Sequence, residues 1–224
     1  MTGPAWYDRA GPVRDERGRE RTDETRRGYD EVAAAYAERF DDELDGKPLD
    51  RMLLDLVAHS VDGVLADVGC GPGHVAAYLR DRGAAVVGVD LSPHMVEVTT
   101  RRHPGIPFRA ADMRALPADD GEWGGIVAFY SVIHVPDLSA VFREFARVLR
   151  PDGTALVSFH VGDEVRHVEK FLGRTISLDF HFFTRPTVEA AMAGAGLEPR
   201  AYLERRSYPA EVETTRGYLL ARRA

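Results

Sequence analysis

The segment from Val64 to Gly73 is a short apolar run that ends in three closely spaced glycines. A run of this kind predicts a buried parallel strand, and a helical pattern from His74 to Arg82 follows it directly. Glycines at such a turn let the backbone approach a ligand closely, while the start of the next helix presents free N–H groups. This strand–turn–helix unit predicts an open α/β sheet with a ligand at its carboxyl edge.

Strands and helices alternate along most of the remaining chain. Short apolar runs predict buried strands, and apolar residues at three- and four-residue steps predict helices. Strands are expected at 84–89, 106–109, 125–130 and 154–159, helices at 93–102, 138–149 and 184–193, a turn at 151–153, and paired strands at 197–206 and 215–220. This alternation predicts right-handed crossovers and a doubly wound, mostly parallel sheet.

The chain of 224 residues is expected to form one domain, residues 25–224, after a flexible N-terminal arm. Residues 1–24 are rich in Arg, Glu, Asp, Gly and Pro and show no apolar periodicity. Residues 25–60 carry two amphipathic helical patterns. An insertion, residues 163–183, follows the fifth predicted strand.

The composition and charge of the chain argue against several classes of binding partner. A formal net charge of −7 argues against binding nucleic acid by phosphate neutralisation. The single cysteine, Cys70, excludes an intramolecular disulfide, and no cluster has zinc-ligand spacing. Neither a secretory signal nor a run of about 18 apolar residues is found. We therefore expect a cytoplasmic monomer or homodimer, with no metal, nucleic acid or membrane as partner.

The spacing of the loop glycines distinguishes between cofactor classes. A dinucleotide-binding loop, Gly-x-Gly-x-x-Gly, would need a glycine where His74 stands, and the lysine of a P-loop is absent. Asp67 precedes the first glycine by two residues. Its carboxylate would repel a phosphate, whereas it would attract a cofactor that carries a cationic amine and no phosphate.

Five motifs, in order, resemble those of class I (Rossmann-like) S-adenosylmethionine-dependent methyltransferases. They are LADVGCGPG at 65–73, GVDLS at 88–92, ADM at 111–113, IVAFY at 126–130 and RVLRPDG at 147–153. The chain is similar to the ubiquinone/menaquinone-type or small-molecule natural-product branch of that family. The resemblance implies S-adenosylmethionine as cofactor, S-adenosylhomocysteine as product, no metal, N-terminal lid helices, and a seven-stranded sheet with an antiparallel last strand.

The resemblance also implies roles for several residues. Asp90 would accept hydrogen bonds from both ribose hydroxyls, and Asp112 would accept from the adenine amino group. The carbonyls of Gly69 and Phe129 would hold the methionine ammonium, with Asp67 acting there directly or through water. From the residues alone, Asp90 could be a strand-end cap and Asp112 the cap of a short turn.

Apolar and aromatic residues complete the expected cofactor site. Leu91 and Met95 would pack near the adenosine and Met113 against the adenine, while Cys70 is expected to be inert because no base stands beside it. In similar methyltransferases a helix with the pattern of residues 29–36 lies over the cofactor as a lid; core packing of the same stripe is the alternative. The full predicted set is Tyr29, Tyr36, Asp67, Gly69, Cys70, Gly71, Gly73, Asp90, Leu91, Met95, Asp112, Met113, Phe129, Tyr130 and His134.

Three histidines are candidates for the catalytic base. Methyl transfer to oxygen usually needs a base, and histidine is suited to that role near neutral pH. His134 follows the fourth strand, His160 closes the fifth, and His181 lies in the insertion. In the resembling branch, a histidine like His134 often lies beside the cofactor. Each of the three could equally be a structural histidine.

The insertion is too apolar for an ordinary surface loop. Residues 176–182 alternate in polarity, which predicts an extra strand with Asp179 and His181 on its polar face. The segment could wall an apolar acceptor pocket, pack on the sheet, or form a subunit interface.

We therefore predict a methyltransferase that acts on an oxygen or nitrogen of a small, partly apolar molecule, such as a natural-product intermediate. Two alternatives stay open: a cofactor-binding protein with a regulatory or no catalytic role, and a methyltransferase acting on a macromolecule.

Overall fold

The computed structural model describes residues 7–10 and 18–224. Its main sheet has seven strands in the order β4-β3-β2-β5-β6-β10-β9. The strands are β2 (Val64–Val68), β3 (Ala85–Asp90), β4 (Phe108–Ala110), β5 (Trp123–Phe129), β6 (Leu149–His160), β9 (Leu197–Arg206) and β10 (Thr215–Arg223). The first five pair in parallel, and β10 is antiparallel to both of its neighbours. The predicted mostly parallel, doubly wound sheet with antiparallel last strands is confirmed.

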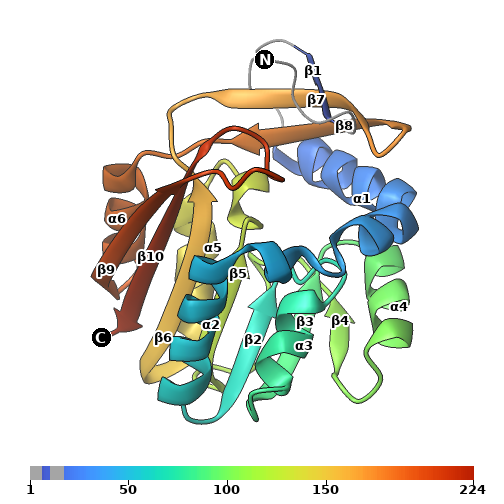
Figure 1. The fold of residues 1–224 in the computed structure, drawn as a ribbon. Helices are drawn as coiled ribbons and strands as arrows, with labels where there is room; N and C mark the ends of the chain where they lie inside the picture. The colour runs from blue at the N-terminus through green and yellow to red at the C-terminus, as the bar shows by residue number, and fades with distance from the viewer. Residues whose placement is uncertain (1–6, 11–17) are drawn as a thin grey trace.

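Helices cover both faces of this sheet (Figure 1). On one face, α2 (Pro48–Ser60) and α3 (His74–Arg80) form one apolar core with the strands; on the other, α5 (Leu138–Val148) and α6 (Arg185–Gly194) form a second. The helix α4 (Pro93–Arg102) lies beside β3 and β4. Side-chain caps at Ser92, Asp137 and Thr184 begin α4, α5 and α6, which explains why these starts could be read from the sequence.

A smaller sheet lies above the carboxyl edge of the large one (Figure 1). It consists of β1 (Tyr7–Ala10), β7 (Val165–Phe171) and β8 (Arg174–His181), in the order β1-β7-β8. The long helix α1 (Gly18–Phe40) packs on β8, and Gly28 permits the close approach, because a Cβ there would lie 3.0 Å from Leu178. Val32 of α1 and Val168 of β7 belong to a third apolar cluster, which is separate from the sheet core.

The structure differs from the sequence-based predictions in three segments. The predicted arm, residues 1–24, contains β1 and the first turns of α1; residues 1–6 and 11–17 lie outside the described residues. The insertion forms the β7–β8 hairpin, in which β8 corresponds to the strand expected at 176–182 and β7 was not predicted. The predicted turn at 151–153 is part of β6, where Asp152 has a φ of 62° and the pairing with β5 shifts register. Within the described residues, no helix is long and apolar enough to span a bilayer.

Candidate active site

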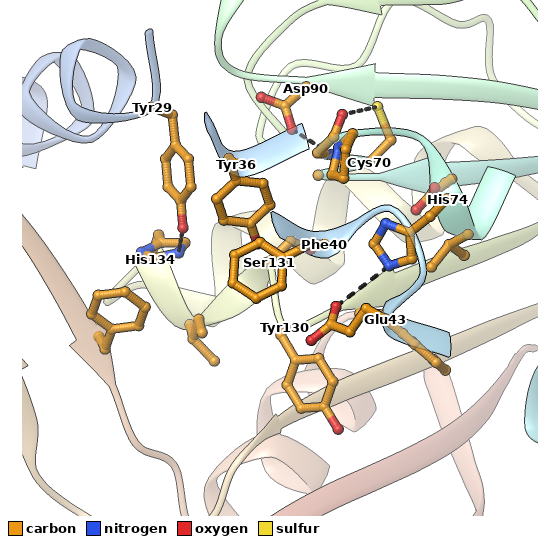
Figure 2. A pocket seen from close by; sticks show the side chains of 18 of the residues that line it. Tyr29, Tyr36, Phe40, Glu43, Cys70, His74, Asp90, Tyr130, Ser131 and His134 are labelled. Carbon is orange, nitrogen blue, oxygen red and sulfur yellow. Dashed lines mark hydrogen bonds and ion pairs between the residues drawn. The ribbon is translucent and has the colours of Figure 1, made fainter. Parts of the chain in front are cut away.

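A cavity of about 520 Å³ runs along the carboxyl edge of the main sheet. Its floor is the ends of the parallel strands and the glycine loop, and its roof is contributed by α1 and the β7–β8 hairpin. Strand order reverses between β2 and β5, the switch point at which open α/β sheets bind ligands. Figure 2 shows that Tyr36 and Phe40 of α1 and Tyr130, which follows β5, point toward a common space.

Positive φ angles shape the glycine loop. Gly69, Gly71 and Gly73 have φ of 74°, 50° and 81°, in the region that favours glycine. A Cβ on Gly69 would stand 2.1 Å from Cβ of Ser131, so the loop is pressed against the residues after β5. Gly71 faces the cavity, where the nearest atom to an added Cβ is a ring carbon of Tyr36 at 3.6 Å.

The N–H groups of this loop are used inside the protein. Those of Gly69 and Cys70 donate to the Val89 carbonyl at 2.7 and 3.0 Å. That of Gly71 donates to the Asp90 carboxylate at 2.9 Å. The loop therefore keeps none of these three donors for a phosphate, which agrees with the reading of its spacing.

Two acids lie under the loop, the buried Asp67 and the partly buried Asp90. Asp67 is 2% exposed and accepts a hydrogen bond from the Ala76 N–H at 3.0 Å. Asp67 thereby accepts from a backbone N–H in the first turn of α3 that would otherwise lack an acceptor. The N-cap of this helix, Gly73, has no side chain that could accept it. Burial raises the pKa of Asp67 to about 8. Burial also raises the pKa of Asp90, whose two oxygens accept from the N–H groups of Gly71 and Ser92.

The predicted adenine acceptor Asp112 has a partner within the protein. Arg114 donates to both carboxylate oxygens of Asp112, at 2.9 and 2.5 Å, and also to the Thr22 hydroxyl of α1 at 2.7 Å. Although burial opposes it, these hydrogen bonds lower the pKa of Asp112. Asp112 lines the cavity, but a ligand amine would share its oxygens with Arg114.

The cavity includes most of the other predicted cofactor residues. It is lined by Tyr29, Tyr36, Gly69, Cys70, Gly71, Leu91, Met113, Phe129, Tyr130 and His134. Met95 and Gly73 do not line it. Met95 is fully buried at the start of α4, and Gly73 faces Thr99, which lies 2.7 Å from an added Cβ.

The thiol of Cys70 is 3% exposed, and burial raises its pKa well above the ordinary value. A protonated, buried thiol is a poor nucleophile, which is consistent with the expected inert role.

Tyr29 and His134 form a hydrogen-bonded pair in the roof of the cavity (Figure 2). The Tyr29 hydroxyl lies 2.8 Å from Nε2 of His134, whose Nδ1 lies 3.0 Å from the Asp179 carbonyl. Because a carbonyl only accepts, Nδ1 carries the proton and Nε2 accepts from the tyrosine. Burial lowers the pKa of His134 to about 4, so the ring is neutral near pH 7.

His160 has a different environment. Nη1 of Arg216 donates to its Nδ1 at 2.5 Å, and the ring stacks on Tyr130 and Phe182. Burial first, and then the charges of Arg216 and Arg166, lower its pKa well below the ordinary value. The lone pair that a base would need is already engaged by Arg216.

His181 does not line the cavity. Its ring is buried and stacks on Phe183, with centroids 6.1 Å apart. The alternation of β8 puts Ile176 and Leu178 in the cluster beneath α1 and turns His181 the other way. Of the three candidate histidines, the structure therefore brings two to the cavity.

The sequence analysis missed a charged end of the cavity. Lys47, just before α2, lies 2.7 Å from Glu43 and 3.1 Å from Glu211. Arg205 of β9 joins Glu211 to the fully buried Asp50, at 2.6 and 3.0 Å. These residues are far apart in the chain and become neighbours only through the β6–β10–β9 pairing. The antiparallel direction of β10 was the one available signal, since it returns Arg216 to the carboxyl edge opposite His160.

Among the described residues, no group of three or more His, Cys, Asp or Glu side chains could hold a metal ion.

The sheet order, the glycine loop and the acids at its edge are those of a Rossmann-like α/β domain. Residues 66–157 match the family model described as "Methyltransferase domain". The matched segment, residues 66–157, is therefore similar to a methyltransferase domain, as the five motifs predicted.

Individual relatives extend this likeness. Methyltransferase GfsG of Streptomyces halstedii is 37% identical over 120 residues, 50% of this chain and 43% of that protein. Nocamycin O-methyltransferase of Saccharothrix syringae is 37% identical over 117 residues, 48% and 41% of the two chains. The chain thus spans less than half the length of these curated relatives.

One solved structure matches almost the whole chain. It is the 1,6-didemethyltoxoflavin-N1-methyltransferase of Burkholderia thailandensis, with bound 1,6-didemethyltoxoflavin and S-adenosylhomocysteine. The TM-score is 0.71 at 22% identity, and the match covers 95% of this chain and 94% of the other. At this identity the likeness establishes the fold, including the segments outside residues 66–157.

Proposed function

We propose that this protein transfers a methyl group from S-adenosylmethionine to an oxygen or nitrogen of a small, partly apolar molecule. The observation that carries the proposal concerns the glycine loop. Its N–H groups donate hydrogen bonds to other groups of the protein, and Asp67 and Asp90 lie beside it. Such a site offers hydrogen-bond acceptors rather than the N–H donors that would bind a phosphate. It therefore fits a cofactor with an ammonium group and ribose hydroxyls. When bound, S-adenosylmethionine supplies a methyl group on a sulfonium centre.

The residues present would bind this cofactor along the β3–β2–β5 edge. Asp90 would accept from the ribose hydroxyls with the lone pairs that Gly71 and Ser92 leave free. Asp67 would accept a hydrogen bond from the ammonium, together with the carbonyls of Gly69 and Phe129. Leu91 and Met113 would flank the adenosine, and Asp112 would receive the adenine amino group beside Arg114. In this proposal Tyr36, across from Gly71, covers the methionine end.

The acceptor would lie toward β6, β10 and the hairpin. The names of two relatives specify methylation of small molecules at oxygen or nitrogen, which supports this substrate class. Phe171, Phe180 and Phe182 give this part of the cavity an aromatic wall. Positioning the acceptor in line with the methyl group would supply much of the rate.

We infer that His134 acts through Tyr29 as the base. As the methyl group bonds to the acceptor, the acceptor proton would pass to the Tyr29 oxygen while the Tyr29 proton passes to Nε2 of His134. Because Nδ1 carries the proton, Nε2 of His134 presents its lone pair to the Tyr29 hydroxyl, which supports this direction of transfer. Engagement of His160 by Arg216 argues against His160 in this role.

Transfer of labelled methyl groups from S-adenosylmethionine to a panel of phenols, amines and sugars tests the proposal. His134→Gln and Tyr29→Phe should each lower kcat by about 10²-fold with little change in KM. Because the pKa of His134 is about 4, the wild-type rate should show no inflection near pH 6.5 from this group. Cofactor binding without product from any acceptor would favour the alternative of a non-catalytic cofactor-binding protein.

A further inference from the structure

Two arginines in the cavity have buried donors without acceptors. Arg216, at the start of β10, is 5% exposed, and its Nε makes no hydrogen bond. Nη1 of Arg166, on β7, is likewise buried and unpartnered. Both residues line the cavity. Because native proteins pair nearly all buried donors, these two atoms point to a ligand that supplies acceptors.

The nearby carboxylates are already engaged. Glu43 is 2.7 Å from Lys47, and Glu211 accepts from both terminal nitrogens of Arg205 at 2.6 and 2.9 Å. The closest oxygen of Glu211 stays 3.6 Å from Nε of Arg216, beyond hydrogen-bond distance. Glu164, the carboxylate paired with Arg166, is 53% exposed, so solvent screens its charge.

Aromatic rings lie between the two arginines. His160 stacks on Phe182 at 5.0 Å and on Tyr130 at 5.7 Å, with interplanar angles of 24° and 29°. The guanidinium of Arg166 lies 4.2 Å from the Phe182 ring centre, and that of Arg216 lies 5.3 Å from the Tyr130 ring centre. The three rings form a stack, and both guanidinium groups lie against it.

Planar surface and unpartnered cationic donors together define a ligand class. We propose that this end of the cavity binds the acid group of a planar aromatic acceptor, through a carboxylate or enolate oxygen held by Arg216 and Arg166. The ring of the acceptor then packs beside this stack. Because Arg216 already donates to Nδ1, the neutral ring of His160 adds no competing acceptor. This inference rests on the proposed function, since it names the acceptor of the same site.

Benzoate and benzamide test the inference, because they differ in the charge of one group. Binding of each is measured by calorimetry to the protein loaded with S-adenosylhomocysteine, so that the cofactor end is occupied. Benzoate should bind at least about tenfold more tightly than benzamide, the effect of one charge-assisted hydrogen bond. Equal affinities, or no binding of benzoate, would overturn the inference.

Two arginine variants locate the effect. Arg216→Met and Arg166→Met should each remove most of the preference for benzoate while S-adenosylhomocysteine binds as in wild type. Arg216 is the more buried of the two residues, and its replacement could prevent folding. The Arg166→Met variant then still tests the inference. Arg174→Met, on an exposed site of the same hairpin, is the control and should keep the preference.

A preference for benzoate that survives both cavity variants would also overturn the inference. Failure of the wild-type protein to bind S-adenosylhomocysteine would overturn the proposed function and this inference with it.

Discussion

The two ends of the cavity are built in opposite ways. At the cofactor end, the loop and its acids lie within a short stretch of chain, and backbone groups make most of the contacts. At the acceptor end, Lys47, Asp50, Arg205, Glu211 and Arg216 come from distant segments, and side chains make the contacts. The first end constrains the ligand by shape and acceptors, whereas the second holds an ion-pair network that also joins α2 to β9 and β10.

This comparison predicts that a substitution at the acceptor end can lower stability without changing the affinity for the cofactor. Asp50→Ala would leave Arg205 with one partner fewer in a buried site and deprive the Tyr218 hydroxyl of its acceptor. Breaking a buried pair costs about 3–5 kcal/mol, which should appear in the free energy of unfolding in urea. The affinity of the folded variant for S-adenosylhomocysteine should be unchanged.

Asp55→Ala is the matched control on the same helix. Asp55 pairs with Arg82, but its side chain is 43% exposed, so its loss should cost about 1 kcal/mol or less. Equal losses for the two variants would show that the network at the acceptor end adds nothing to stability beyond a surface pair.

At the cofactor end, we expect Asp67 to make the stability of the protein depend on pH. The pKa of Asp67 is about 8 in the folded protein, above its value in an unfolded chain, so the folded state binds more protons between these values. Stability from this group is therefore full below about pH 4 and is lost as the pH rises toward about 8, by at most about 1.4 kcal/mol per pH unit.

Asp67→Asn keeps the shape of the side chain and cannot titrate. In urea unfolding between these pH values, the variant should lack the downward slope that Asp67 gives the wild type. An identical slope in both proteins would place the proton uptake elsewhere.

The same contrast explains what could be predicted from the sequence. Strand β2, the loop and Asp90 follow from apolar runs, glycine spacing and strand ends, all of which are local signals. Met95 does not line the cavity, because the pattern of α4 predicts a buried face but not what that face packs against. The turn expected at 151–153 failed because a left-handed Asp152 accommodates the sequence as an irregularity within β6.

The acceptor end had no local signal. Arg205 lies near the end of β9 and Glu211 in the connection to β10, while Asp50, the buried partner of Arg205, lies on α2, far back in the chain. The alternation of β8 did predict that Asp179 and His181 share a face, but not that α1 would cover the opposite face. Tertiary packing therefore decided which histidine reaches the cavity.

Calorimetric binding of S-adenosylmethionine to wild type, Asp90→Ala and Asp62→Ala tests the central claim most directly. Asp62 precedes β2, and its side chain is 95% exposed, so its removal should leave the affinity unchanged. Loss of two hydrogen bonds to a carboxylate should weaken binding to folded Asp90→Ala by about a hundredfold. Binding of Asp90→Ala as tight as that of the wild type would contradict the placement of the cofactor.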